Sequence, residues 1–415
     1  MPDLLLRLSK DILVVEGGLR ASLEREGAGA EVEVVSTLSA YGSYDLGTKT
    51  PDARPACSSP APVTFDSTYL NVMDPELVQT VHERYVAAGA HCGISNTLTA
   101  NRYSLAAQGL EDQLSAVNRA GMRALRRAGY QHLLAAVGPL LGKDTTADTI
   151  AACGGNSSAA VNRETDNCNS NLQRAQQDTR PQHVKQAVTA YGEQIVALAA
   201  EFPDALFLSG FTSLGDLRLA LEAARAMSDL PVICGLRLAP DGSLASDQAV
   251  SPVLPESPAP AQAAAAYADG SLADHPSCRA TLEDVLRFLE AQDVSALGFG
   301  YGLVPKQLLA LTQRLARATK LPLYTIVEIE PSARRPSPVA VSRATDSLAD
   351  LALQLRQAGA HLIGPGACAL PVHCAAIYAV ACGPTPAQAA FVPALLAHDF
   401  SNPALLAHDL NGCRS

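Results

Sequence analysis

Three features that mark particular protein classes are missing from this chain of 415 residues. Basic residues are in the minority, 31 Lys and Arg against 41 Asp and Glu, and a net charge of −10 argues against nucleic-acid or anionic-membrane partners. The ten cysteines contain no C-x-x-C pair, which argues against a structural zinc module and a small secreted disulfide framework. No apolar run is long enough to span a membrane. We therefore expect a soluble, cytoplasmic protein with a small-molecule substrate.

What the chain does contain is a regular alternation of two kinds of segment. Eight short aliphatic or β-branched runs predict strands at Ile12–Val15, His91–Ser95, His132–Val137, Ala205–Leu208, Pro231–Cys234, Ser295–Phe299, Leu321–Val327 and His361–Ile363. Segments with helical periodicity follow nearly all of them, for example Leu214–Met227 and Pro371–Ala381. Alternating strands and helices imply a parallel sheet, and eight such units favour a closed (β/α)8 barrel, the TIM barrel, over an open doubly wound sheet.

Three long segments interrupt this alternation, at residues 28–64, 143–180 and 240–277. Each is too long for an ordinary connection, and in a barrel each would lie on the carboxyl-terminal face, as a lid or as a disordered excursion. The end of the chain carries a repeated Pro-Ala-Leu-Leu-Ala-His-Asp segment. We expect one barrel domain over residues 1–385 and an appended tail over residues 386–415.

Seven short motifs stand at the predicted strand ends or in the helices that follow. They are Glu16-Gly17-Gly18-Leu19, Asn71–Val78, Ser95–Asn101, Val137-Gly138-Pro139, Phe211–Arg225, Gly298–Leu303 and Leu362–Cys368. In this order they resemble homocysteine S-methyltransferases, the family that includes the betaine-dependent enzyme and the homocysteine domain of cobalamin-dependent methionine synthase. The resemblance spans most of the chain. It implies a (β/α)8 barrel that transfers a methyl group at its carboxyl-terminal mouth.

The resemblance also implies a zinc site made of one cysteine after strand six and two adjacent cysteines after strand eight. Tyr301, Gly366 and Ala367 occupy these positions here. Zinc in this family lowers the thiol pKa of homocysteine, and three soft ligands cannot be exchanged for these residues while a thiolate-rich site is kept. We expect no zinc and no other cofactor, although Cys368 or Cys234 stays open as part of a replacement metal site.

Three residues at predicted strand ends are candidates for catalysis: Glu16, Tyr301 and Glu328. Glu16 takes the place of the Asp that the family has before its first Gly-Gly, and it could meet an ammonium group. A phenol at position 301 could donate a proton or a hydrogen bond. Two alternatives stay open, because Glu16 could pair with Arg20 or Arg237 as a structural group and Tyr301 could plug the pocket.

Seven further residues are candidates for substrate binding: Gly17, Gly18, Asn96, Thr97, Asn101, Ser209 and Cys368. The glycines would let the backbone approach a ligand, or would serve only tight turns. The asparagines and the threonine could contact ligand, or could cap a helix and tie a loop. Ser209 stands where the family has another Glu. Cys368 is placed at the mouth, but a single cysteine is often an inert, buried residue.

Three classes of function remain open. The preferred one is divergent methyl transfer to or from a small thiol-like or amino-acid-like substrate without the thiolate zinc site. The second is a catalytically inactive barrel that serves as a binding, regulatory or structural subunit. The third is a different reaction, such as that of a lyase or demethylase, run by Glu16, Glu328 and Tyr301. Whether the chain forms a homo-oligomer or joins a larger assembly also stays open.

Overall fold

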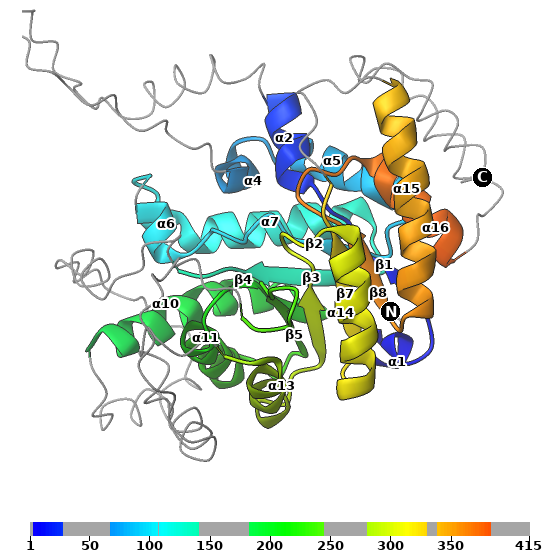
Figure 1. The fold of residues 1–415 in the computed structure, drawn as a ribbon. Coiled ribbons are helices and arrows are strands. Elements are labelled where there is room, and N and C mark those ends of the chain that lie inside the picture. Colours follow the sequence, from blue (N-terminus) through cyan, green and yellow to red (C-terminus); the bar gives the residue numbers. More distant parts are fainter. Residues whose placement is uncertain are drawn as a thin grey trace, which may run out of the picture.

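Eight parallel strands alternate with helices along the chain, and the helices surround the strands (Figure 1). The computed structural model describes residues 3–27, 67–106, 108–140, 182–244, 280–329 and 338–382. The strands are β1 (Leu13–Val14), β2 (Cys92–Ile94), β3 (His132–Val137), β4 (Ala205–Phe211), β5 (Val232–Leu236), β6 (Ala296–Phe299), β7 (Leu323–Val327) and β8 (Leu362–Pro365). The predicted insertions at 28–64 and 143–180, most of 240–277 and the tail at 386–415 lie outside the described residues.

The helices begin and end at local signals that the sequence carries. Asp74 accepts a hydrogen bond from Leu77 N–H at the start of α5, and Thr281 and Asp284 form a capping box at the start of α13. Gly129, with a left-handed φ of 89°, ends α7. The major helices are α2 (Leu19–Gly27), α5 (Pro75–Ala87), α7 (Leu114–Ala128), α10 (Gln182–Ala199), α11 (Leu214–Met227), α13 (Leu282–Ala291), α14 (Pro305–Ala318), α15 (Pro338–Gln357) and α16 (Pro371–Ala381). Shorter ones are α1 (Leu4–Leu8), η1 (Ser67–Tyr69), α4 (Leu70–Met73), α6 (Arg102–Ala106) and η2 (Glu111–Gln113).

The sheet closes into a barrel at a short seam between its first two strands. The strand order is β1-β8-β7-β6-β5-β4-β3-β2, so β1 and β2 are the two ends of the sheet. A parallel bridge joins Val15 to Cys92, and the N–H of His91 donates to the carbonyl of Val14 at 2.8 Å. The Glu16 N–H donates to the Cys92 carbonyl at 3.0 Å. The predicted (β/α)8 barrel is confirmed.

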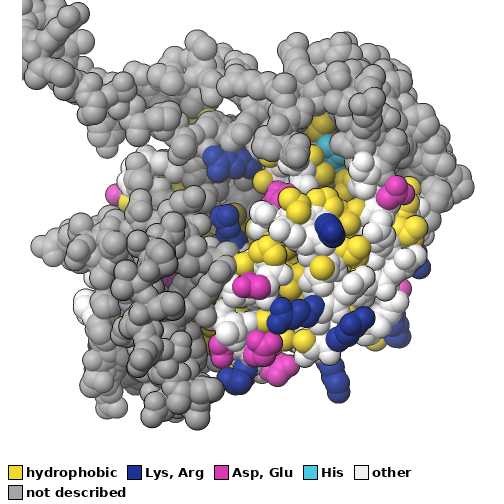
Figure 2. Space-filling view, viewed as in Figure 1, with side chains coloured by type: hydrophobic (Ala, Val, Ile, Leu, Met, Phe, Trp, Pro, Cys, Tyr) yellow, Lys and Arg dark blue, Asp and Glu magenta, His cyan; other side chains and the backbone are white. Residues whose placement is uncertain are grey.

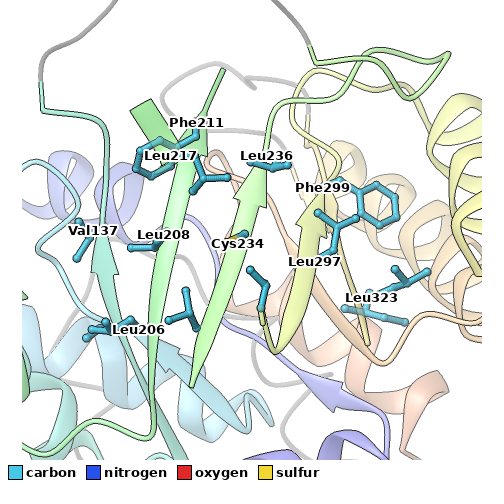
Figure 3. Close-up of a cluster of buried hydrophobic side chains, with 14 of the residues drawn as sticks. Val137, Leu206, Leu208, Phe211, Leu217, Cys234, Leu236, Leu297, Phe299 and Leu323 are labelled. Carbon is cyan, nitrogen blue, oxygen red and sulfur yellow. The ribbon is translucent and has the colours of Figure 1, made fainter. Parts of the chain in front are cut away.

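Alternate residues along each strand face the inside and the outside of the barrel. On β4, Phe207 belongs to an inner cluster. Its neighbours Leu206 and Leu208 belong to an outer cluster between strands and helices (Figure 3). The inner cluster also contains Leu13, Val15, Cys92, Leu134, Ile233, Tyr324, Ile326 and Leu362. Because both faces of the strands are buried, the segments are apolar almost throughout.

The amino-terminal end of the barrel is covered by α1. Leu4 and Leu8 of this helix are buried in the inner cluster, so the short helix closes the end at which the strands begin. Asp3 caps it by accepting a hydrogen bond from Leu5 N–H at 2.9 Å. A ligand would therefore enter at the opposite end, the mouth, where the strands finish.

On the described face seen in Figure 2, acidic and basic side chains are interspersed among apolar ones. Arg314 on α14 pairs with Glu283 on α13 at 3.3 Å, which is one such contact between neighbouring helices. In the described part of the chain, no helix is both long and apolar enough to cross a membrane.

Candidate functional site

Four polar side chains come from four consecutive strand ends at the mouth. Ser209 lies near the end of β4, Arg237 directly after β5, Tyr301 after β6 and Glu328 directly after β7. The hydroxyl oxygens of Ser209 and Tyr301 are 2.5 Å apart, a hydrogen bond in which either can donate. Glu328 and Arg237 both lie close enough to influence the ionisation of Tyr301. We call these four residues the mouth cluster.

Tyr301 covers the barrel interior at the mouth. Its ring packs against the inner cluster, while the residue as a whole is only partly buried. Burial raises the pKa of Tyr301 to about 12, against the opposing effect of the hydrogen bond with Ser209. The phenol is therefore protonated at neutral pH and can donate a hydrogen bond.

Glu328 lies against the backbone of the last strand. A Cβ atom built on Gly366 would stand 2.5 Å from the Oε2 of Glu328, so this carboxylate takes the space that a side chain at position 366 would need. Burial raises the pKa of Glu328, and a hydrogen bond with the backbone of Gly302 and the charge of Arg237 act in the opposite direction. A carboxylate with a raised pKa is a stronger base than an ordinary surface glutamate.

Arg237 is a member of this cluster that the sequence did not identify as a site residue. The sequence offered it only as a partner for Glu16, because the predicted strand ended at Cys234. In the structure β5 continues to Leu236, and the backbone N–H of Arg237 bonds to the carbonyl of Phe211 on β4 at 3.1 Å. Ile233 faces the inside of the barrel and Cys234 the outside, and alternation brings residue 237 to the inside.

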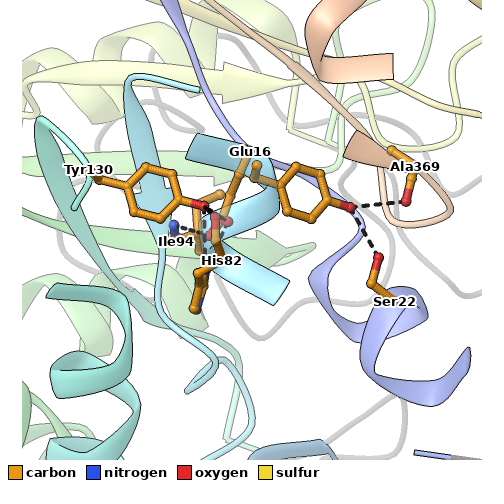
Figure 4. A network of polar contacts seen from close by, with 7 residues as sticks. Glu16, Ser22, His82, Ile94, Tyr130 and Ala369 are labelled. Carbon is orange, nitrogen blue, oxygen red and sulfur yellow. Dashed lines mark hydrogen bonds and ion pairs between the residues drawn. The ribbon is translucent and has the colours of Figure 1, made fainter. Parts of the chain in front are cut away.

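The structure does not bring Glu16 together with the mouth cluster. Val15 faces the barrel interior, so the next side chain points outward, toward the helices (Figure 4). The carboxylate, 1% exposed, accepts hydrogen bonds from Ile94 N–H at 2.5 Å and from the hydroxyl of Tyr130, and it lies 2.9 Å from Nδ1 of His82 on α5. We call Glu16, His82 and Tyr130 the seam cluster. This placement gives no support to the predicted catalytic role of Glu16.

Asn96, Thr97 and Asn101 bond to the protein itself. The amide of Asn96 donates to Ser67 O and Asn71 Oδ1, and its oxygen accepts from the Ser67 hydroxyl. Thr97 donates to the carbonyl of Ala136 on β3 at 2.8 Å. Asn101 accepts the N–H groups of residues 103 and 104 and so caps α6. The tying and capping roles considered from the sequence account for these contacts.

The two glycines after β1 are explained by close contact with the β8–α16 connection. A Cβ on Gly17 would stand 1.7 Å from the carbonyl oxygen of Pro365. Gly18 has a φ of +72°, and a Cβ there would be 2.2 Å from the carbonyl oxygen of Ala369. Their small size serves backbone packing at these positions. Cys368, in the same connection, is a partly buried free thiol.

Within the residues that the structure describes, no three His, Cys, Asp or Glu side chains are grouped so as to hold a metal ion. Cys234, which faces the outer cluster, and Cys92, in the inner cluster, are both fully buried, and burial raises the pKa of each thiol. Both are therefore protonated core residues, and neither lies with the mouth cluster.

Comparison with known proteins gives results for both family and fold. The model of the homocysteine S-methyltransferase family matches residues 13–381. The metallated form of the homocysteine methyltransferase MmuM from Escherichia coli has a similar structure, with a TM-score of 0.56 and 20% identity over 91% of this chain and 99% of that one. Its apo form gives a TM-score of 0.51 and 20% identity, over 91% and 98% of the two chains. No curated relative matches the chain. The chain belongs to the homocysteine S-methyltransferase family.

Proposed function

We propose that this barrel transfers a methyl group to or from a small thiol-like or amino-acid-like substrate at its mouth, without the thiolate zinc site of its family. The observation that carries the proposal is the mouth cluster, which brings an acid, a phenol, a hydroxyl and a guanidinium together at the ends of β4 to β7. In (β/α)8 enzymes, catalytic groups come from the ends of several strands at this face. The family supports methyl transfer as the reaction class.

In this proposal Glu328 acts as the general base that removes the thiol proton, a step that zinc assists in the family. When a thiol acceptor is methylated, its S–H proton leaves, a sulfur–carbon bond forms, and the bond between the methyl carbon and the donor atom breaks. Glu328, whose pKa burial raises, would receive the proton. Tyr301, protonated at neutral pH, would donate a hydrogen bond that orients the substrate.

The side chains at the expected zinc positions do not fit a three-thiolate site. Tyr301 presents a phenol oxygen that is already bonded to Ser209. Gly366 has no donor atom, and the Glu328 carboxylate fills the space beside it. Ala367 presents an exposed methyl group. We therefore propose that zinc has no part in the chemistry of this chain.

The test is an assay of homocysteine methylation with S-methylmethionine, betaine and S-adenosylmethionine as donors, together with elemental analysis of the purified protein. The proposal expects methyl transfer from at least one donor, unchanged by chelators, with less than stoichiometric zinc. Glu328→Gln should lower the rate, whereas Glu290→Gln on the exposed face of α13 should not. One zinc per chain together with chelator-sensitive activity would contradict the proposal.

A second candidate function is a catalytically inactive barrel that serves as a binding, regulatory or structural subunit. The observation in its favour is Tyr301, whose ring packs onto the inner cluster and whose hydroxyl is bonded to Ser209, as a plug would be. The two candidates differ in a thermal-shift screen with amines, thiols and sulfonium compounds. Stabilisation that is lost in Glu328→Gln, together with methyl transfer, supports the enzyme. Stabilisation without methyl transfer supports an inactive barrel that binds a ligand, and the absence of any stabilising ligand supports an inactive structural subunit.

A further inference from the structure

The side chain of Arg237 stands out in the mouth cluster because of its charge. Burial raises the pKa of Glu328, and the guanidinium of Arg237 counteracts this, so the two groups interact without a close ion pair. In fact no carboxylate of the described residues forms an ion pair with Arg237. Other arginines in the described part of the chain, such as Arg119, Arg123 and Arg314, do pair with glutamates.

A guanidinium in this position has a specific chemical preference. Its planar set of N–H donors matches the two oxygens of a carboxylate. Arg237 is partly buried, so part of its hydration is lost, and an anion that restored those hydrogen bonds would be bound more tightly than at an exposed site.

The neighbours of Arg237 limit the charge of that anion. Glu328 is the acid of the same cluster, and Ser209 and Tyr301 are neutral hydroxyls there, so the cluster contains one acid and one fixed cation. A dianion such as a phosphate would meet one guanidinium and be repelled by the glutamate. A monocarboxylate would be repelled less than a dianion, and a neutral or cationic remainder of the same molecule would suit Glu328.

We propose that Arg237 is a specificity-determining residue that selects substrates bearing a carboxylate, by binding that group at the mouth. The proposal rests on the proposed function, since it assigns one end of the substrate of the same site. Glu328 and Tyr301 then face the remainder of the substrate, where the methyl group is gained or lost.

The test uses pairs of probe molecules that differ in the carboxylate. Betaine is compared with choline, and homocysteine with 3-aminopropane-1-thiol, by isothermal titration calorimetry on the full chain. We expect the wild type to prefer the carboxylate member of at least one pair by about tenfold or more. Arg237→Met should remove that preference and leave binding of the other member within about twofold. Arg237→Gln serves as a second variant if the methionine protein does not fold.

The matched control is Arg317→Met, on the exposed face of α14, which should change neither member of a pair. If the wild type binds both members equally, or if the Arg237 variants weaken both equally, Arg237 does not read a carboxylate, and methyl transfer can still stand. If the protein selects the carboxylate member of a pair but transfers no methyl group, the proposed role of Arg237 is supported and the proposed reaction is contradicted. Failure of all four probes to bind, with no methyl transfer, defeats both.

Discussion

The seam cluster and the mouth cluster are built from similar side chains at the ends of strands in one barrel. Each has an acid and a phenol, Glu16 with Tyr130 at the seam and Glu328 with Tyr301 at the mouth. At the seam the acid is 1% exposed and accepts hydrogen bonds from partners on β2 and before β3. At the mouth the phenol bonds to a serine, and the acid is only partly buried.

The difference shows that the role of an acid at a strand end cannot be assigned until the direction of its side chain is known. A buried carboxylate with its donors in place stabilises the fold and has little left to offer a ligand. A partly buried carboxylate beside an arginine can still exchange a proton or meet a substrate. The predictions below test this division of labour between the two clusters.

The largest effect is expected for Glu16→Ala. The substitution leaves the N–H of Ile94 and the ring of His82 without their buried acceptor, and the hydroxyl of Tyr130 keeps only the carbonyl of His82 as an acceptor. The free energy of unfolding, measured by urea titration followed by circular dichroism, should fall by about 3–5 kcal/mol. The control Glu290→Ala, on the exposed side of α13, should stay within about 0.5 kcal/mol of the wild type. Normal stability with lost ligand binding would move Glu16 back into the site.

The next largest effect is expected for Gly17→Ala, which should lower the free energy of unfolding by about 3 kcal/mol. The new Cβ would stand 1.7 Å from the Pro365 carbonyl oxygen, so the connection after β8 must shift. Gly302→Ala is the matched control, since its Cβ meets nothing within 4 Å and only its φ of +76° opposes the change. That control should lose about 1 kcal/mol. Equal losses at both positions would show that packing against Pro365 is not what requires glycine.

The same substitution in both clusters compares them directly. Tyr130→Phe removes a donor to a buried carboxylate and should cost about 1.5–3 kcal/mol of unfolding free energy. Tyr301→Phe removes a bond between two hydroxyls and should cost about 0.5–1.5 kcal/mol. Methyl transfer, where it is measured, should fall in the Tyr301 variant alone. The reverse order of stability would refute the division proposed above.

The smallest effect is expected for Glu328→Gln, and it depends on pH. Burial raises the pKa of Glu328 in the folded state above its pKa in the unfolded chain. At a pH above the unfolded pKa, the unfolded chain therefore loses this proton more readily than the folded protein does. Stability from this group is therefore present at low pH and is lost as pH rises through the folded pKa. The glutamine variant should match the wild type at acidic pH and exceed it at neutral pH, by about 0.5 kcal/mol or less. Glu290→Gln should show no such divergence.

Most of the fold could be predicted because its signals are local. The predicted strand His132–Val137 and the predicted helices Leu214–Met227 and Pro371–Ala381 have the same bounds in the structure. Prediction ended β4 at Leu208, whereas the strand continues to Phe211 through an irregularity after Ser209. Such a register shift depends on the neighbouring strand, which a local pattern does not contain.

The site was predicted less well, and the reason lies in the strands themselves. Strands of a parallel barrel are buried on both faces, so Leu13, Val14 and Val15 are all apolar and give no alternation from which to orient the next residue. The same holds for Ile233 to Leu236, before Arg237. Tyr301 lies in the motif Gly298–Leu303, and Glu328 follows the predicted strand Leu321–Val327, so local patterns indicated the strand end of each; their roles in the site remain a prediction.

The sequence by itself determined the order of strands and helices, the eightfold alternation and the family, since these follow from short-range patterns and ordered motifs. Only the tertiary structure decided which polar group serves the fold and which faces the mouth. Glu16 meets His82 from 66 residues away and Tyr130 from 114 residues away, and Ser209 meets Tyr301 across 92 residues. Contacts at such distances exist only once the barrel has closed, because strand register and side-chain direction are set by pairing between segments that the local sequence does not connect.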